Sequence, residues 1–458
     1  MKKTTILLVA AMSLSLTSCN IYKKYEMPTD NSYVKAYEES LTARADSSSL
    51  PYLQWDYVFT DPVLQGYIRT ALANNKDLDN AVKNIDIAKA QLKGAKLSYF
   101  PSVALNPNGG AAKYGDGKMD TWTYTIPLAV NWEIDVFGKI LNRKRGAQVA
   151  VEQMQDYWQA VRSQIICGVA NTYYGLMLLN QQLDLTQRTS EIWKDQVESM
   201  RLMKQAGMVN EAAVVQSEAN YWSIMGSIPD IKEQIHQLQN TMSLLLHEYP
   251  KEWTVSQQME FDLPVSIEQG VPITYLAARP DVRAAERSLA SAYYATNSAR
   301  AAFYPSLTIS AQGGFTNLLG SMVVNPGKFF LQLAGSLAAP LFSRGANIAN
   351  LEVAKARQAQ AMNDFETSVL SASADVSDAL ASYRYNHEKR EYLLKQIDDL
   401  EKSVEYTQEL LTLDQRTTYL EVLTARSSLL NAQMSSLAAW HSKVSALISL
   451  YQSVGGGR

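Results

Sequence analysis

Apolar and polar residues alternate with a period of two in four stretches of the chain, which predicts β-strands with one face of each kind. Three stretches are clear, at 121–132, 307–316 and 329–337, and a fourth at 102–114 is interrupted by Pro107 and two glycines. Runs of about 10 residues with this alternation are typical of membrane β-strands. A soluble antiparallel sheet with one face on a core shows the same alternation, so the pattern leaves both interpretations open.

Two stretches without proline predict helices too long for a globule. Residues 139–205 contain three glycines, and residues 346–413 contain none. Each stretch, if helical throughout, extends about 100 Å at 1.5 Å per residue. A partner helix is expected at 418–451. Since helices of this length need packing partners, we expect a helical tube or coiled coil, with an ordinary long antiparallel bundle as the alternative.

Two breaks in the helical pattern predict the far tip of the assembly. The first lies near Gly207, with Asn210 as the N-cap of the following helix, and the second spans 414–417. Each break is separated from the strands by the length of a long helix. We therefore expect both turns at the end opposite the strands.

The two halves of the chain repeat one pattern at an offset of 204 residues. That offset superimposes Asp77 on Asp281, Ala88 on Ala292, Pro101 on Pro305, and Gly109-Gly110 on Gly313-Gly314. One register that holds through a helix, a proline and two glycines indicates an internal duplication. We expect structural repeats at 62–249 and 273–451, joined by an equatorial linker at 250–272. The C-terminal tail, 452–458, is expected to be mobile at its glycine-rich end.

The number of strands has a consequence for assembly. Four strands cannot close a membrane barrel, because such barrels begin at about 8 strands and leave no unpaired edge in lipid. The chain would therefore pool its strands with copies of itself. Three copies give twelve strands and two give eight, and the strand pattern does not choose between them.

The N-terminus has the features of an export signal. Two lysines precede a mostly apolar stretch at 6–16, which is too short to be a spanning helix with these flanks. Residues 16–19, LTSC, resemble a bacterial lipobox, which implies removal of a signal peptide at 1–18 and acylation of Cys19. We expect 19–61 to be a lipid-anchored N-terminal segment. The alternative is an ordinary signal peptide with an incidental cysteine.

Composition removes several classes of function. The chain is 47% hydrophobic with a formal charge of −3, which argues against disorder and against a nucleic-acid surface. Its two cysteines, Cys19 and Cys167, are too few for a disulfide scaffold. Beyond the first twenty residues, no run of about 18 apolar residues indicates a spanning helix.

The sequence offers no constellation suited to catalysis. Its four histidines are scattered without metal-ligand spacing, its methionines are dispersed, and it has no phosphate-binding motif of the P-loop type. We therefore expect no enzyme activity, no catalytic residue, no metal site and no cofactor apart from the covalent lipid on Cys19.

Five short motifs follow one another along the chain: WEIDVFGK at 132–139, RPDV at 279–282, FYPS at 303–306, YLEVLTA at 419–425 and LYQSVGGG at 450–457. Together, and in this order, they resemble the TolC/OprM-like outer-membrane efflux proteins, in the lipid-anchored branch that serves RND-type pumps. The resemblance covers essentially the whole mature chain.

The resemblance implies a fold that is mainly α with a membrane β-barrel. A homotrimer would form a twelve-stranded outer-membrane β-barrel that continues into a twelve-helix periplasmic α-barrel. The implied function is a passive exit duct for small molecules in a tripartite efflux system, anchored by lipid in the outer membrane. The implied partners are two further copies, a periplasmic adaptor protein, an inner-membrane RND-type pump and outer-membrane lipid, with no nucleic acid.

The same resemblance implies a gate or an adaptor contact at the periplasmic tip. Gly207 fits the glycine that the family has at the first tip turn, whereas the second turn reads DQRT at 414–417 and lacks one. The aspartate that the family has near the start of the following helix is Ala213 here. The candidate tip residues are Gly207, Asp414, Arg416 and Thr417.

Alternative functions explain only part of the chain. A structural coiled-coil lipoprotein that bridges envelope layers would account for the helices and Cys19, but not for the strands. A specific porin would account for the strands, but not for the helices. At the tip, Asp414 and Arg416 could equally be solvated loop charges.

Overall fold

The computed structural model describes residues 20–28, 32–42, 50–112, 121–257, 259, 261–264, 273–319, 322–340, 342, 344–413 and 419–457. Contacts within the chain divide it into two compact units. The strand unit consists of Met1–Val34, Lys83–Asp156 and Arg283–Thr367. The helical unit consists of Lys35–Val82, Tyr157–Val282 and Ser368–Arg458.

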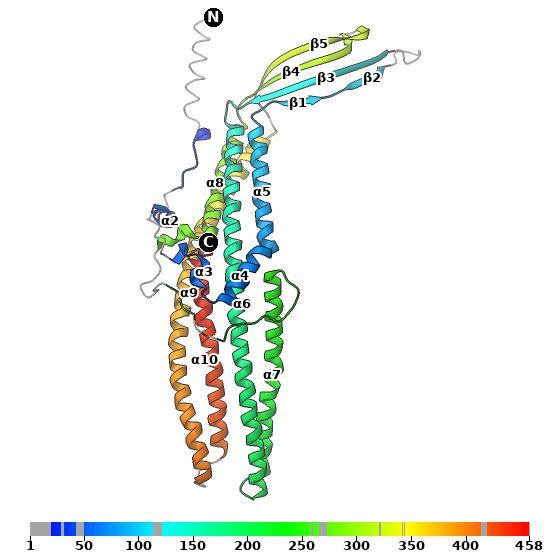
Figure 1. Ribbon diagram of the computed structural model, residues 1–458. Helices are drawn as coiled ribbons and strands as arrows, with labels where there is room; N and C mark the ends of the chain where they lie inside the picture. The colour runs from blue at the N-terminus through cyan, green and yellow to red at the C-terminus, as the bar shows by residue number, and fades with distance from the viewer. Residues whose placement is uncertain are drawn as a thin grey trace. The chain divides into compact units, whose positions relative to one another are not determined.

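Each half of the chain follows one order of elements: a helix, strands, a very long helix and a returning helix (Figure 1). The first half contains α5 (Lys76–Leu97), β1 (Ser102–Leu105), β2 (Asn108–Ala112), β3 (Thr121–Ile134), α6 (Lys139–Gln205) and α7 (Glu211–Leu246). The second contains α8 (Pro280–Ala301), β4 (Ser306–Leu319), β5 (Met322–Ala338), α9 (Ala346–Leu413) and α10 (Tyr419–Ser453). The shorter elements are η1 (Asn20–Tyr22), α2 (Ser32–Thr42), η2 (Leu50–Tyr52), α3 (Trp55–Val58), α4 (Pro62–Asn74) and η3 (Ile273–Ala278).

The two long helices extend over the stretches that lack proline, which confirms this prediction. The helix α6 has 67 residues and α9 has 68. In the helical unit α7 returns along α6, and α10 returns along α9 (Figure 1). Among the described residues, no helix is both long enough and apolar enough to cross a membrane.

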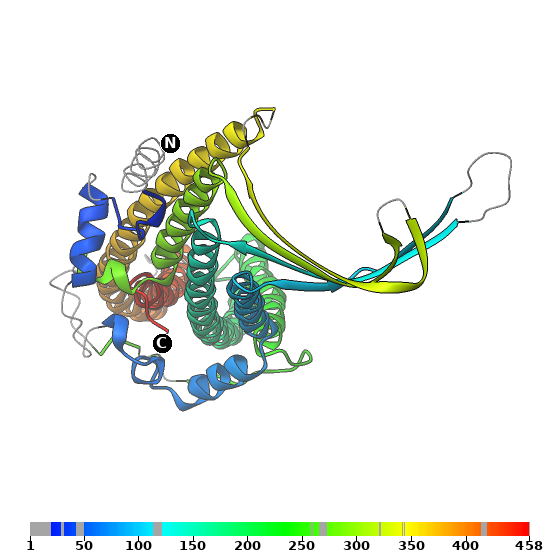
Figure 2. The same ribbon diagram turned by 90° about the horizontal axis from the view of Figure 1, so that it is seen from above.

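The strands form one antiparallel sheet in the order β1-β3-β4-β5. The short strands β1 and β2 pair in succession with one edge of β3, and the interruption expected at Pro107 is the gap between them. The strands β4 and β5 pair along most of their length, with an irregularity between Thr316 and Leu318. Seen from above, β3, β4 and β5 run side by side (Figure 2).

The core of the helical unit forms where α3 and α4 pack against α6 and α10. The helix α4 begins at Pro62 because Asp61 caps it, accepting a hydrogen bond from the Val63 N–H at 2.8 Å. Trp253 and Phe261, from the segment between the two halves, are buried in the same core. Further large side chains buried there are Phe59, Leu64, Ile68, Ile166, Tyr173, Leu447 and Tyr451.

The glycine-rich C-terminal tail is buried, so the expectation that it is mobile is wrong for Gly455, Gly456 and Gly457. The Gly457 N–H donates to the Tyr451 hydroxyl at 2.8 Å. Gly455 has φ +88°, and a Cβ there would lie 2.6 Å from the Ala278 carbonyl oxygen. The absence of side chains therefore lets the backbone enter a gap that any other residue would overfill.

Candidate functional site

The register of the sheet separates an apolar face from a polar face. Apolar residues stand opposite one another in the pairs Ile126–Phe315, Trp132–Ile309, Phe315–Phe329 and Leu307–Leu337. On the other face, Thr308 pairs with Ser336 and Gln312 with Gln332. The apolar face is uncovered, and Leu333 is 73% exposed. A contiguous apolar face of this kind suits contact with lipid or protein, whereas the polar face suits contact with water.

The first tip turn is a glycine-terminated helix end. Gly207 has φ +72°, its N–H donates to the Lys204 carbonyl at 2.9 Å, and the Met208 N–H donates to the Met203 carbonyl at 2.9 Å. This is the Schellman pattern, in which a left-handed residue closes the last turn of a helix. Asn210 then caps α7, because its side chain accepts from the Ala213 N–H at 3.1 Å.

Ion pairs join α6 to α7 beside this turn. The Arg201 guanidinium donates twice to the Glu218 carboxylate, from Nε at 3.2 Å and from Nη2 at 2.7 Å. Lys204 pairs with Glu211 at the turn itself. Because solvent screens exposed charges, these pairs add little to stability.

A buried hydrogen bond ties α7 to α10. The Tyr419 hydroxyl lies 2.7 Å from the Ser217 hydroxyl, and both residues are buried. Apolar side chains of three helices surround them: Trp193 and Met200 of α6, Val214 of α7, and Leu423 of α10. Burial raises the pKa of Tyr419, so its hydroxyl remains protonated at neutral pH and able to donate.

The structure describes one of the five residues predicted for the site. This residue is Gly207, which ends α6. Cys19, Asp414, Arg416 and Thr417 lie outside the described residues, so their roles stay predictions. Sequence analysis missed Tyr419 and Ser217. The available signals were a tyrosine directly after the second break and a short polar residue on the apolar face of α7.

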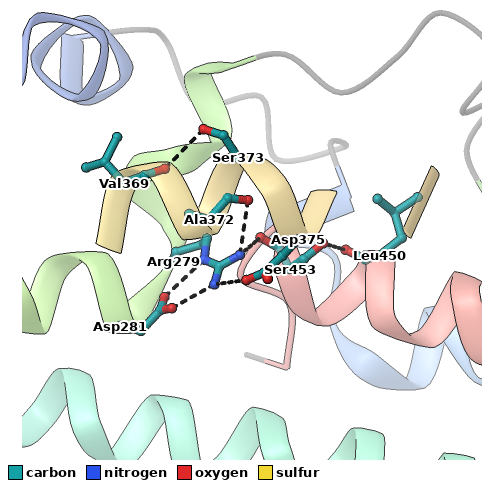
Figure 3. A network of polar contacts seen from close by, with 8 residues as sticks. All are labelled: Arg279, Asp281, Val369, Ala372, Ser373, Asp375, Leu450 and Ser453. Carbon is teal, nitrogen blue, oxygen red and sulfur yellow. Dashed lines mark hydrogen bonds and ion pairs between the residues drawn. The ribbon is translucent and has the colours of Figure 1, made fainter. Parts of the chain in front are cut away.

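A buried arginine joins three helices of the helical unit (Figure 3). Arg279, at the start of α8, is 7% exposed and donates to Asp281 from Nε at 3.0 Å and from Nη2 at 2.7 Å. It also reaches Asp375 of α9 at 2.8 Å. Its Nη1 donates to the carbonyls of Ser453 at 3.0 Å and Ala372 at 3.4 Å. Burial alone would lower the pKa of Arg279, but its contacts with Asp281 and Asp375 raise it overall.

A polar groove of about 830 Å³ lies beside Arg279. Its polar lining includes Asp281, Asp375, Asp378, Ser382, Ser442, Ser445 and Ser449. The opposite side of α10 carries core residues such as Val444 and Leu447, so this helix has a serine-rich face suited to line water. Within the described ranges, no three His, Cys, Asp or Glu side chains gather as they would around a metal ion.

The two-faced sheet and the paired long helices are the features expected of an outer-membrane channel. The sequence matches the family described as outer membrane efflux protein over residues 67–246 and 271–456. The chain therefore belongs to the outer membrane efflux protein family.

Curated relatives span most or nearly all of the chain. The cation efflux system protein CusC of Escherichia coli K12 is 26% identical over 460 residues, covering 98% of this chain and 99% of the relative. The probable outer membrane lipoprotein SilC of Salmonella typhimurium is 27% identical and covers 88% of each chain. The toluene efflux pump outer membrane protein TtgC of Pseudomonas putida is 24% identical, covering 99% of this chain and 96% of the relative.

Solved structures share the fold. A CusC crystal structure matches with a TM-score of 0.83 at 24% identity, covering 95% of this chain and 98% of that chain. The open state of the MtrE channel of Neisseria gonorrhoeae matches with a TM-score of 0.80 at 24% identity, covering 95% and 97%. The chain thus has the helical-barrel and β-barrel fold of these channels. It is an outer-membrane efflux channel with a long periplasmic helical extension.

Proposed function

We propose that three copies of this chain form a passive exit duct, coupled to a periplasmic adaptor protein and an inner-membrane RND-type pump. The observation that carries the proposal is the two-faced sheet, which has an uncovered apolar face and too few strands to close alone. Pooling three sheets gives a twelve-stranded barrel with lipid outside and water inside. The duct performs no chemistry, and the energy for export comes from the pump.

Native mass spectrometry of the gently solubilised assembly tests this proposal. We expect three mature chains, each carrying the mass of a diacylated or triacylated glyceryl cysteine. A lipid-bearing monomer that is stable in detergent would contradict the trimer, because its sheet would keep unpaired edges.

We also propose the lipid anchor and the division of the chain stated from the sequence. The signal peptide is 1–18, Cys19 carries the lipid, and the repeats are 62–249 and 273–451. The repeated order of elements supports this division. Labelling cells with radioactive palmitate should mark the wild-type protein but not Cys19→Ser, and equal labelling of the two would exclude Cys19 as the acylated residue.

At the tip we propose that polar contacts hold the duct shut or meet the adaptor. Gly207, Asp414, Arg416 and Thr417 are the proposed residues of the gate or of the adaptor contact. The tie between Tyr419 and Ser217 supports a closed tip, because it holds α10 against α7. Replacing Arg416 by Ala and recording conductance in a planar bilayer tests the gate: unchanged closed-state conductance would remove Arg416 from it.

We leave the cargo of this duct open. The relatives' names refer to cations for CusC and to toluene for TtgC, although both proteins match this chain over nearly its full length. Cargo that differs so widely among similar ducts supports a pump that selects the cargo and a duct that conducts it.

A further inference from the structure

The end of the sheet where the strands continue into helices has a surface of its own. The helix α5 leads into β1, and β3 leads into α6. Since Ser102, the first residue of β1, pairs with Asn131 of β3, both helices meet the sheet at one end (Figure 1). We call this end, formed by residues 93–102 and 131–145, the foot of the sheet.

Large apolar and aromatic side chains are exposed at the foot. Phe100 is 68% exposed, and Leu97 and Trp132 are exposed as well. The Trp132 indole N–H donates to the Tyr99 carbonyl at 2.9 Å, which joins the end of β3 to the segment after α5. Tryptophan in particular favours the interface between the hydrocarbon and the headgroups of a membrane, because its ring is apolar and its N–H is polar.

Basic side chains lie directly beyond these residues. Four of them form what we call the basic collar: Lys93 and Lys96 in the last two turns of α5, and Arg143 and Lys144 in the first two turns of α6. The two groups lie close together, because the Lys144 ammonium is 5.8 Å from the ring centroid of Tyr99. Within the described ranges, no carboxylate forms an ion pair with any residue of the collar. The collar is therefore a positively charged surface that the chain itself leaves uncompensated.

The needs of the helices do not explain the whole collar. Lys93 and Lys96 lie near the C-terminal end of α5, where the helix dipole favours cations. Arg143 and Lys144 lie near the N-terminal end of α6, where the same dipole disfavours them. The corresponding start of α9, residues 346–354, contains no basic residue. A basic helix start is thus no requirement of this architecture, and it indicates an anionic ligand.

The segment that follows the proposed lipid anchor docks at the collar. The Asn142 side chain donates to the Ile21 carbonyl at 2.9 Å, and Arg145 donates to the Tyr22 carbonyl at 3.0 Å. Asn142 and Arg145 flank the two collar residues of α6, and the docked segment begins directly after Cys19. A lipid on Cys19 would therefore enter the membrane beside the collar, which supports headgroups at this height of the molecule.

We propose that the basic collar binds anionic phospholipids of the periplasmic leaflet through their phosphate groups. The proposal rests on the proposed function, since it assumes a sheet that spans the membrane with its foot on the periplasmic side. The apolar strand face, the aromatic residues and the collar then follow one another in the order of hydrocarbon, interface and phosphate. Guanidinium and ammonium groups form strong charge-assisted hydrogen bonds with phosphate oxygens. A net negative headgroup is preferred over a zwitterionic one, because the collar has no carboxylate to pair with a lipid cation.

Native mass spectrometry of the solubilised full-length assembly tests the class of lipid. The delipidated protein is titrated with phosphatidylglycerol or with phosphatidylcholine of the same acyl chains, and the bound lipids are counted by mass. We expect phosphatidylglycerol to bind at least about fivefold more tightly. Its advantage should shrink as salt is added, because salt screens exposed charges. Equal binding of the two lipids would overturn the proposal. Displacement of phosphatidylglycerol by millimolar inorganic phosphate would also overturn it, because it would indicate a site for free anions.

Charge removal tests whether the collar is the binding surface. The double variant Arg143→Gln/Lys144→Gln should bind phosphatidylglycerol about fivefold more weakly for each removed charge, and phosphatidylcholine as before. The matched control is Arg384→Gln/Lys389→Gln, which removes two exposed charges from the second half of α9 and should bind both lipids as the wild type does. An equal decrease in the control would refute the collar, because it would attribute the preference to net charge.

The mass of the assembly and its planar-bilayer conductance separate this proposal from the proposed function. Wild-type trimers that conduct normally but bind the two lipids equally contradict the collar alone. Wild-type preparations that form neither trimers nor conducting channels contradict the proposed function itself.

Discussion

Arg279 shows what a single side chain contributes to this architecture. A buried guanidinium is costly unless every nitrogen finds an acceptor, and here Nε, Nη1 and Nη2 all donate. Two of the acceptors are the main-chain carbonyls of Ala372 and Ser453, which belong to α9 and α10. The arginine therefore joins the start of α8 to two helices that come much later in the chain.

Replacing Arg279 by Met should destabilise the helical unit. Methionine retains the volume but removes the donor that satisfies the Ser453 carbonyl at the end of α10, and a buried unsatisfied group costs about 1–3 kcal/mol. Thermal unfolding followed by circular dichroism should show a lower Tm. Asp375→Asn is the control, because it keeps an oxygen acceptor at a half-exposed position and should cost less. Equal decreases in Tm for the two variants would show that the bond from Arg279 to the main-chain carbonyl is not what stabilises the unit.

Glycines in this chain should differ in their tolerance of a methyl group. Gly455→Ala should lower Tm, since its Cβ would meet the Ala278 carbonyl at 2.6 Å and its φ is positive. Gly226→Ala, inside α7 with no atom within 4 Å of the added Cβ, should instead stabilise by about 0.5–1 kcal/mol. A tail that is mobile in solution would make Gly455→Ala harmless.

The helices and strands carry the properties expected of a channel wall. Each strand presents an apolar and a polar side, and α10 turns a serine-rich side away from its core side. At the tip, the helices α6, α7 and α10 meet in a small apolar cluster that contains one hydrogen bond between α7 and α10. These faces and this cluster belong to whole helices and strands, because each is formed by several residues on one side of an element.

Loss of the Tyr419–Ser217 hydrogen bond should favour opening of the tip. Tyr419→Phe removes the hydroxyl and keeps the ring in its apolar cluster, and a hydrogen bond contributes about 0.5–1.5 kcal/mol net. The open fraction should therefore rise about 2- to 10-fold, measured as conductance in planar bilayers. Ser217→Ala should have a similar effect, and the double variant should add little to either. Fully additive effects would show that the two hydroxyls act separately.

The two faces of β5 should respond oppositely to an added charge. Leu333→Arg places a guanidinium on the apolar face, where a mid-membrane arginine costs about 2–4 kcal/mol. Gln332→Arg, one residue earlier, places the same group on the polar face and should leave assembly intact while changing conductance. Heat modifiability of the trimer on gels measures stability. Equal destabilisation by the two variants would show that the apolar face does not contact lipid.

Assembly explains why one chain is incomplete. The sheet of a single copy has an uncovered apolar face and unpaired edges, which lipid does not tolerate. The proposed trimer removes both problems by closing the barrel. It also surrounds the long helices with neighbours, which they need because helix propensity alone contributes little to stability.

Local patterns were enough to predict most of the fold. The period of two located the strands, including the interruption at Pro107, and the absence of proline located α6 and α9. These predictions succeeded because strand and helix periodicity depend on near neighbours in the chain. The burial of Gly455–Gly457 was missed, because a glycine-rich ending has no local feature that distinguishes a free tail from one packed against Ala278 and Ser163.

The amino-acid sequence alone therefore established the class of protein, the kind and order of its elements and the glycine that ends α6, because each of these follows from local periodicity, turn chemistry and motif order. Only the tertiary structure decided which distant residues meet. Tyr419 and Ser217 lie 202 positions apart and share one hydrogen bond. Arg279 and Ser453 lie 174 positions apart, and they too are joined by a hydrogen bond. No pattern along the chain specifies such pairs, since they depend on how long helices pack side by side.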